Sequence, residues 1–186
     1  MRLIGMEARK GLREVRKKKP GKRRFPGGKR VYYLGAVEIL AQEFQGKEAT
    51  GHEMRDTVER FYTDLGPYLG WPFSAWFDFV RLIPYVSDEA RFPERVIELV
   101  PRPAYLLDRA LFPKIDCKKK AILIASWARG NGYPYRFLAV SGRLDKMVHH
   151  VFPQIDFGRG WVTADATFPD FQAGQPQNLT FAAELI

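Results

Sequence analysis

The only cysteine of this 186-residue chain, Cys117, lies in the stretch IDCKKKAILIAS, where an aspartate precedes it and three lysines follow. Asp116 is a favourable N-cap residue, so Cys117 is expected in the first turn of an apolar helix. There the backbone N–H groups and the helix dipole favour a thiolate, and Lys118, Lys119 and Lys120 add positive charge nearby. The same N–H groups can hold the oxyanion formed when a thiolate attacks a carbonyl. A lone cysteine is also often a small buried apolar residue, so Cys117 needs partners before it gains a role.

A nucleophilic cysteine needs a base, and the base needs an orienting group. The chain has three histidines, His52, His149 and His150. His52 lies in a polar connection between predicted helices and is most simply a surface residue. His149 and His150 begin the segment HHVFPQIDFGRGWVTADATF, which predicts a hairpin about Gly158-Arg159, because glycine in the first turn position suits a type II′ turn.

The register of this hairpin predicts which histidine meets a carboxylate. With the turn at Gly158-Arg159, His150 lies opposite Thr167. Asp165 is then a diagonal neighbour of His150 on the same face of the sheet, within reach of its side chain. His149 points to the other face, and a slip of one residue would reverse the choice.

Cys117, His150 and Asp165 therefore predict a nucleophile, a base and an orienting carboxylate, the thiol counterpart of the serine triad. His150 and Asp165 alone would also fit an ordinary pair at a strand edge. The coincidence of the three features in one chain favours the catalytic interpretation.

The surrounding patterns predict an α+β fold, with helices first and then a helix followed by antiparallel strands. Apolar spacing of three and four predicts helices over residues 31–45 and 52–69. Residues 71–86 are aromatic and ambiguous between helix and strand, and residues 93–100 are a short helix candidate. A buried helix is expected from Cys117 to the Gly130-Asn131-Gly132 cap, and residues 135–142 alternate as a strand does.

The chain is expected to comprise a basic N-terminal arm, residues 1–30, and one domain, residues 31–186. Within the domain, residues 31–75 form a helical N-terminal part and residues 76–186 the core. The arm holds 13 Lys or Arg against 2 Glu, a net charge of +11, while the remainder has 17 basic and 19 acidic residues. Such a block is a solvated tail or binds an acidic partner, either a protein surface or nucleic acid. Nucleic acid ranks last, since no aromatic residues interleave with the charges.

Several classes of protein are disfavoured by composition. No run of about 18 uncharged apolar residues is present, so no membrane span is expected, and the N-terminus lacks the apolar region of a secretory signal. One cysteine permits no internal disulfide and no thiolate metal cluster, which fits a reducing compartment. Neither zinc-ligand spacing nor a phosphate-binding loop is present, so no metal or cofactor is expected.

The stretches IDCKKKAILIASWARGNGYPYRFLAV, HHVFPQI and GRGWVTADAT resemble, in order, the motifs of the transglutaminase-like superfamily. That family has a papain-like core in which Gly-Asp-Cys opens an apolar helix, and a histidine strand and a Gly-x-Trp-Val-x-x-Asp segment follow. LIPYVSDE and PRPAYLLDR resemble segments that precede the cysteine in bacterial and phage members. The likeness covers roughly residues 79–169, and it carries the roles of nucleophile, base and orienter to Cys117, His150 and Asp165.

The chain departs from the family pattern at three points. Ile115 replaces the family glycine, which bears on access to the thiol. No Trp or Gln aligns clearly as a second oxyanion donor, for which Trp76 and Tyr105 are the nearest candidates. Residues 1–75 match no family pattern.

The resemblance implies a thiol enzyme that acts on amide bonds of a protein or peptide, as a peptidase, deamidase or acyltransferase. The small members that it most resembles are encoded among tail genes of bacteriophages and prophages. It therefore implies a virion tail component whose basic arm binds other tail proteins, or otherwise a bacterial cytoplasmic protein. The alternative is a catalytically silent tail-tip or tail-completion protein that uses the fold and the arm for assembly, since fold does not establish chemistry.

Overall fold

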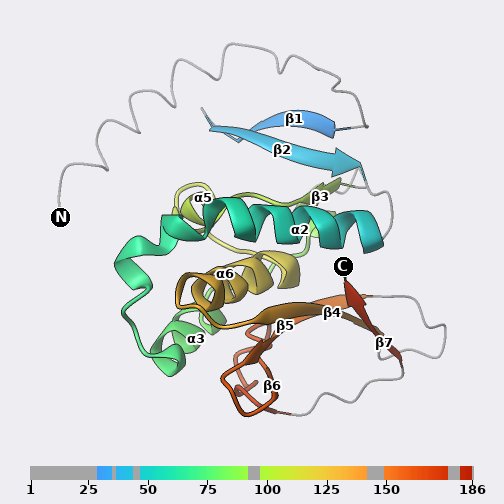
Figure 1. Cartoon of the computed structure of the whole chain (residues 1–186). Helices are drawn as coiled ribbons and strands as arrows, with labels where there is room; N and C mark the ends of the chain where they lie inside the picture. The colour runs from blue at the N-terminus through green and yellow to red at the C-terminus, as the bar shows by residue number, and fades with distance from the viewer. Residues whose placement is uncertain are drawn as a thin grey trace.

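The computed structural model describes residues 29–34, 37–43, 47–91, 97–141, 149–175 and 181–185 (Figure 1). Helices accompany two antiparallel sheets in these ranges, so the fold is α+β, as predicted. The elements in chain order are β1 (Lys29–Leu34), β2 (Val37–Glu43), α2 (Lys47–Phe61), the 3-10 helix η1 (Tyr62–Tyr68), α3 (Phe73–Arg81), α4 (Asp88–Arg91), β3 (Ile97–Leu99), α5 (Pro103–Leu107), α6 (Cys117–Gly130), β4 (Tyr135–Ser141), β5 (His150–Asp156), β6 (Trp161–Thr163) and β7 (Phe181–Leu185).

Helix α6 lies at the centre of the molecule. It packs against β4 and β5 on one side and against α2 on the other, and it also contacts η1 and α3 (Figure 1). All its residues from Lys119 to Ala128 are buried. The predicted cap is confirmed, because the Asp116 carboxylate accepts a hydrogen bond of 3.0 Å from the backbone N–H of Lys119. The helix ends where Gly132 adopts the left-handed φ of 79° that glycine tolerates best.

The larger sheet has the order β6-β5-β4-β7 and carries the predicted hairpin. The predicted register is confirmed, because Gln154 pairs with Thr163 and Asp156 pairs with Trp161. The connection spans residues 157–160, four rather than two. The Asp156 carboxylate closes it by accepting the backbone N–H groups of Gly158 and Gly160, at 2.7 and 3.1 Å.

The smaller sheet, β1-β2-β3, corrects two predictions. The helix expected over residues 31–45 is wrong for the residues described there, because residues 31–34 and 37–43 belong to β1 and β2, with Leu34 paired to Val37. Valine, tyrosine and isoleucine favour strands, and the Gly-Ala dipeptide between the two runs is a two-residue hairpin signal that apolar spacing concealed. The short helix expected over residues 93–100 is also wrong at Ile97–Leu99, which pairs with β2, while residues 93–96 lie outside the described residues.

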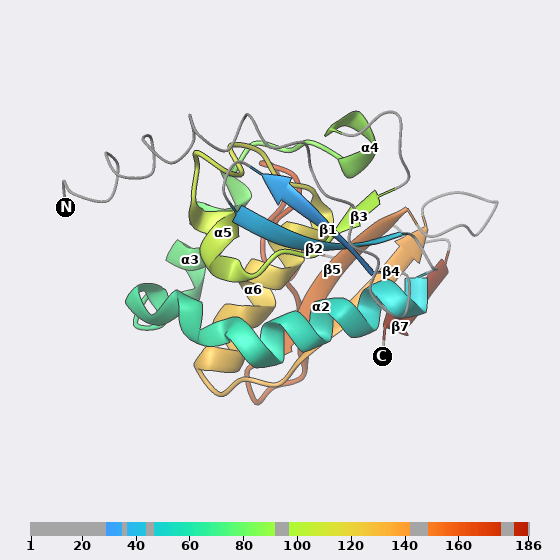
Figure 2. The same cartoon turned by 90° about the horizontal axis from the view of Figure 1, so that it is seen from above.

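The helical prediction for residues 52–69 is confirmed by α2 and η1, and the ambiguous aromatic segment forms α3. Met54, Val58 and Leu65 are buried, as the spacing predicted. Figure 1 shows the smaller sheet and the β4-β5 strands on opposite sides of the helical layer, and Figure 2 shows β1 and β2 crossing over the molecule from above.

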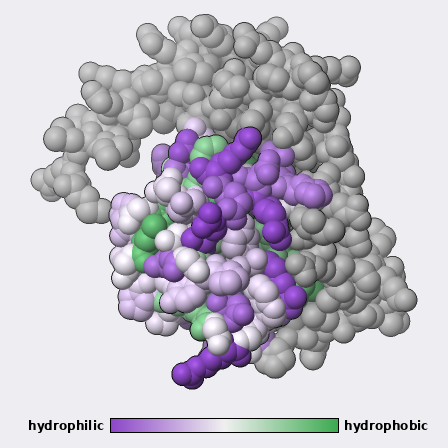
Figure 3. Space-filling view, viewed as in Figure 1, coloured by the Kyte–Doolittle hydropathy of each residue, from purple (hydrophilic) through white to green (hydrophobic). Residues whose placement is uncertain are grey.

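On the face shown in Figure 3, the described residues are mostly hydrophilic, and hydrophobic residues form small separate patches. None of the helices in the described ranges combines the length and apolar character that crossing a membrane requires. The expected arm lies almost wholly outside the described residues, which begin at Lys29.

Candidate active site

Cys117 is the first residue of α6 and is 7% exposed. The extended backbone of Asp116 brings the chain into the helix at this point, so the thiol lies where the first-turn N–H groups converge. Burial removes the thiol from bulk water without enclosing it completely. This environment strengthens any charge interaction that the sulfur makes.

The His150 imidazole contacts the Asp165 carboxylate, as the register predicted. His150 Nε2 lies 2.6 Å from Asp165 Oδ2, and the carboxylate is buried. The second carboxylate oxygen, Oδ1, accepts a hydrogen bond of 3.0 Å from the backbone N–H of Thr167. His149 is exposed, and its backbone N–H donates to the carbonyl of Val140. The hairpin therefore directs His150, and not His149, toward the acidic side chain.

The Cys117 side chain is the other acidic neighbour of the imidazole, and it contributes to the raised pKa of His150. Since Nε2 faces Asp165, Nδ1 is the ring nitrogen left for the thiol. Burial lowers the pKa of His150, but the hydrogen bonds and charges of Asp165 and Cys117 outweigh it and raise that pKa to about 10. The three predicted side chains thus meet in one cluster, whose arrangement favours an imidazolium between two acidic groups.

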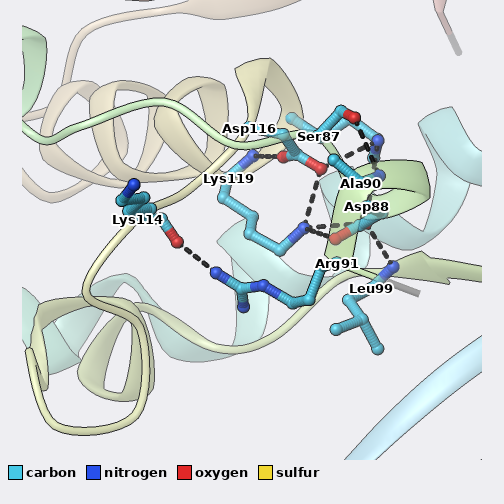
Figure 4. A network of polar contacts seen from close by, with 9 residues as sticks. Ser87, Asp88, Ala90, Arg91, Leu99, Lys114, Asp116 and Lys119 are labelled. Carbon is cyan, nitrogen blue, oxygen red and sulfur yellow. Dashed lines mark hydrogen bonds and ion pairs between the residues drawn. The ribbon is translucent and has the colours of Figure 1, made fainter. Parts of the chain in front are cut away.

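The three lysines after the cysteine do not surround the thiol as free charges. Lys119 is buried, and its ammonium binds the carboxylates of Asp88 (2.7 and 2.8 Å) and Asp116 (2.8 Å) in the network of Figure 4. Lys118 lies 3.0 Å from Asp116 as well. Lys120 is also buried, and it binds backbone carbonyls. The expectation that all three simply add positive charge beside the thiol is therefore corrected.

Asp88 was not singled out by its sequence. It lies at the start of α4, and its carboxylate also accepts the backbone N–H of Leu99 at 3.0 Å. Burial and the charge of Asp116 raise the pKa of Asp88 to about 6, against the opposing effect of Lys119. The pKa of Asp116 is lowered: burial opposes ionisation, but Lys119, Lys118 and the helix N–H outweigh it. Asp88, Asp116 and Lys119 form a buried ion network beside Cys117, and the half-buried Lys118 joins it through Asp116.

Ile115, where the resembled family keeps glycine, is fully buried in the core. Its backbone N–H donates to the carbonyl of Pro84 at 2.9 Å, and its carbonyl accepts from Val86 at 3.3 Å. The Ile115 side chain therefore packs inward, and its backbone ties the segment around Tyr85 to the start of α6.

Neither candidate for a second oxyanion donor gains support. The indole N–H of Trp76 donates to the carbonyl of Leu123 at 3.3 Å in the core. Tyr105 lies in α5, where its ring centroid is 5.8 Å from the guanidinium of Arg102. The donors identified for an oxyanion are therefore the backbone N–H groups at the start of α6.

Two exposed aromatic side chains border the base. Phe168 lies 6.2 Å from the His150 ring and 6.2 Å from the Tyr85 ring, measured between centroids. Phe168 and Tyr85 are each 44% exposed. One side of the site is thus an apolar rim, defined by Tyr85 and Phe168, that can contact the apolar part of a substrate.

His52 is exposed on α2. Among the described residues, no group of three or more His, Cys, Asp or Glu side chains could hold a metal ion.

Comparisons of the chain with protein-family models, with curated proteins and with solved structures found no match. The chemistry open to this site therefore has to follow from its own geometry.

Proposed function

We propose that this protein is a transglutaminase-like thiol enzyme that acts on amide bonds, with Cys117 as nucleophile, His150 as base and Asp165 as orienting carboxylate. The observation that carries the proposal is that the His150 imidazole contacts a buried carboxylate at 2.6 Å and has the Cys117 side chain as its second acidic neighbour. A buried carboxylate that holds the imidazole in place is what a thiol nucleophile needs from its neighbours.

In the proposed reaction, His150 holds the proton given up by the thiol, as an imidazolium, and the Cys117 sulfur attacks the amide carbonyl carbon. The resulting oxyanion is stabilised by N–H groups at the start of α6. The imidazolium then gives its proton to the leaving nitrogen, the C–N bond breaks, and a thioester remains on Cys117. Water or a second amine attacks the thioester while His150 takes its proton, and the C–S bond breaks. Water yields a carboxylic acid, as in a peptidase or deamidase, and an amine yields a new amide.

Thiol reactivity tests this proposal directly, because Cys117 is the only cysteine and every alkylation event reports on it. Native protein is treated with iodoacetamide near neutral pH, and labelling is followed by mass spectrometry against a urea-denatured sample. We expect native Cys117 to react faster than the denatured thiol, because His150 is the proposed base for it. If Cys117 reacts only after denaturation, the proposal that the protein is a thiol enzyme is wrong.

The Cys117→Ala variant should fold, by circular dichroism, and should lack turnover on amide substrates such as glutamine-containing peptides. Retained turnover in this variant would also contradict the proposal.

A second candidate function is assembly into a phage tail, and it rests on the net charge of +11 over residues 1–30. Such an arm can bind an acidic surface of a neighbouring subunit. We expect deletion of residues 1–28 to prevent incorporation into a particle, which sedimentation with the other tail proteins measures. Normal incorporation of the truncated chain contradicts the assembly role and leaves the enzyme unaffected.

A further inference from the structure

Lys120 is a fully buried lysine whose hydrogen-bond partners are backbone carbonyls rather than carboxylates. It is 1% exposed. Its ammonium donates to the carbonyls of Arg81 (2.9 Å), Ala166 (3.0 Å) and Thr167 (3.0 Å). An ammonium has three N–H donors, so these carbonyls use its full capacity.

Two of these carbonyls belong to the residues that immediately follow Asp165. Thr167 is held from both sides, since its carbonyl accepts from Lys120 and its N–H donates to Asp165 Oδ1 at 3.0 Å. Lys120 lies one helical turn after Cys117, so one face of α6 carries both residues. The turn of α6 that supplies the nucleophile therefore also holds the segment that supplies the orienting carboxylate.

The charges around Lys120 come from three segments. The pKa of Lys120 is lowered to about 8, and burial is the main cause. The positive charges of Arg109, before α6, and of Arg81, in α3, also lower this pKa, whereas the charge of Asp165 raises it. Asp165 is thus the charge that stabilises the buried ammonium. Because such coupling is reciprocal, Lys120 stabilises the Asp165 carboxylate to the same extent.

We propose that Lys120 is a positioning residue of the site: its ammonium fixes the backbone after Asp165 and so holds the carboxylate against His150. This inference rests on the triad of the proposed function and adds a fourth, buried member to it. Lys120 does not touch a substrate, because its three donors are committed to backbone carbonyls.

The test is an NMR titration of the His150 imidazole in wild type and in Lys120→Met, which keeps the length of the side chain and removes its charge. Loss of a nearby positive charge by itself favours the imidazolium and raises the His150 midpoint. Displacement of Asp165 does the opposite. We expect the midpoint to fall by about one unit or more, a tenfold change in proton affinity, so a fall reports lost positioning. A folded Lys120→Met protein with an unchanged or raised midpoint overturns the inference.

The matched control is Lys119→Met, which removes the neighbouring buried ammonium of the same helix. Lys119 binds Asp88 and Asp116 rather than the Asp165 segment. We expect the His150 midpoint in this variant to stay at its wild-type value. An equal fall in both variants would indicate a general loosening of α6 and would also overturn a specific role of Lys120.

If Lys120→Met does not fold, the inference is tested instead by titrating Lys120 in an Asp165→Asn variant. Asp165→Asn removes the charge that favours the Lys120 ammonium, so the Lys120 midpoint should fall below its wild-type value of about 8. An unchanged Lys120 midpoint overturns the inference. A native Cys117 that resists iodoacetamide, in contrast, contradicts the proposed enzyme, while both titrations still report on Lys120.

Discussion

Two buried charged clusters flank the start of α6, and they differ in how they are closed. The network of Asp88, Asp116, Lys118 and Lys119 pairs carboxylates with ammonium groups at 2.7 to 3.8 Å. The cluster of Cys117, His150, Asp165 and Lys120 instead presents a 7% exposed thiol beside an apolar rim with side chains 44% exposed. The same helix end thus carries one set of charges that compensate each other and one that includes the proposed nucleophile.

Positive charges that lie close to Cys117 in the sequence are bound by other groups in the fold. Lys119 lies closer to Cys117 in sequence than His150 does, yet its charge is taken up by Asp88 and Asp116. What distinguishes the reactive cluster is an imidazole held between a carboxylate and the thiol. Variants in the two clusters should therefore fail in different ways.

The largest effect is expected for His150→Ala, which removes the base from the reactive cluster. A positioned base contributes about 10²- to 10⁴-fold to a rate, so alkylation of native Cys117 at pH 7 should slow by about 10²-fold or more. The rate is measured by stopped alkylation and mass spectrometry. His149→Ala is the matched control and should react like wild type. Equal rates for both variants would show that the imidazole does not activate the thiol.

The compensated network should instead be broken by Lys119→Met. Removing one partner of a buried ion pair leaves uncompensated charge, so the free energy of unfolding should fall by about 3–5 kcal/mol. Urea denaturation followed by circular dichroism measures this loss. The protein that stays folded should keep alkylation within a few-fold of wild type. A stability change below about 1 kcal/mol would mean that the network is not structural.

The contribution of His150 to the free energy of unfolding should depend on pH in a way that its raised pKa predicts. Its folded pKa of about 10 lies above the ordinary value of 6.5, so the folded protein keeps a proton that the unfolded chain releases. The resulting stabilisation is complete below pH 6.5 and is lost as the pH rises through 10. The difference in unfolding free energy between wild type and His150→Asn should shrink over this range, in urea titrations at stepped pH. If the difference in unfolding free energy between the two proteins does not change with pH, the pKa of His150 is not raised in the folded state.

The smallest effect is expected at the apolar rim. Phe168→Ala removes an exposed ring beside His150, so it should slow labelling by N-benzylmaleimide a few-fold relative to N-methylmaleimide, since apolar contact is worth about 1 kcal/mol at such sites. Trp161→Ala, at a residue that is 43% exposed, is the control and should leave the ratio unchanged. An unchanged ratio in Phe168→Ala means that the rim does not contact the reagent.

The geometry of the candidate site was largely predictable because it depends on local rules. An aspartate before an apolar run identifies the helix start. The alternation of a hairpin distinguishes His150 from His149 once the turn is placed. The Asp156 carboxylate stabilises that turn by accepting hydrogen bonds from the N–H groups of Gly158 and Gly160, so the register did not depend on distant segments.

The rest depended on contacts that sequence spacing does not reveal. The acceptors of Lys120 lie 39 to 47 residues away, and Asp88 lies 31 residues from Lys119. One signal was present, since the run AILIASWA after Lys120 leaves α6 without a polar face and so forces the lysines inward. Over residues 31–45, the apolar residues fit the period of a helix as well as that of a strand. The strand propensity of the side chains favours the strands that the structure has in this segment.

The position of the β5-β6 hairpin also affects the biogenesis of the site. A nascent chain emerging from the ribosome as far as Ser141 holds Cys117 but neither His150 nor Asp165, nor the carbonyls of Ala166 and Thr167. The thiol therefore meets His150 only after the chain has emerged as far as Thr167 and the hairpin docks onto α6. Until then, the growing polypeptide carries a cysteine that lacks the side chain proposed to activate it.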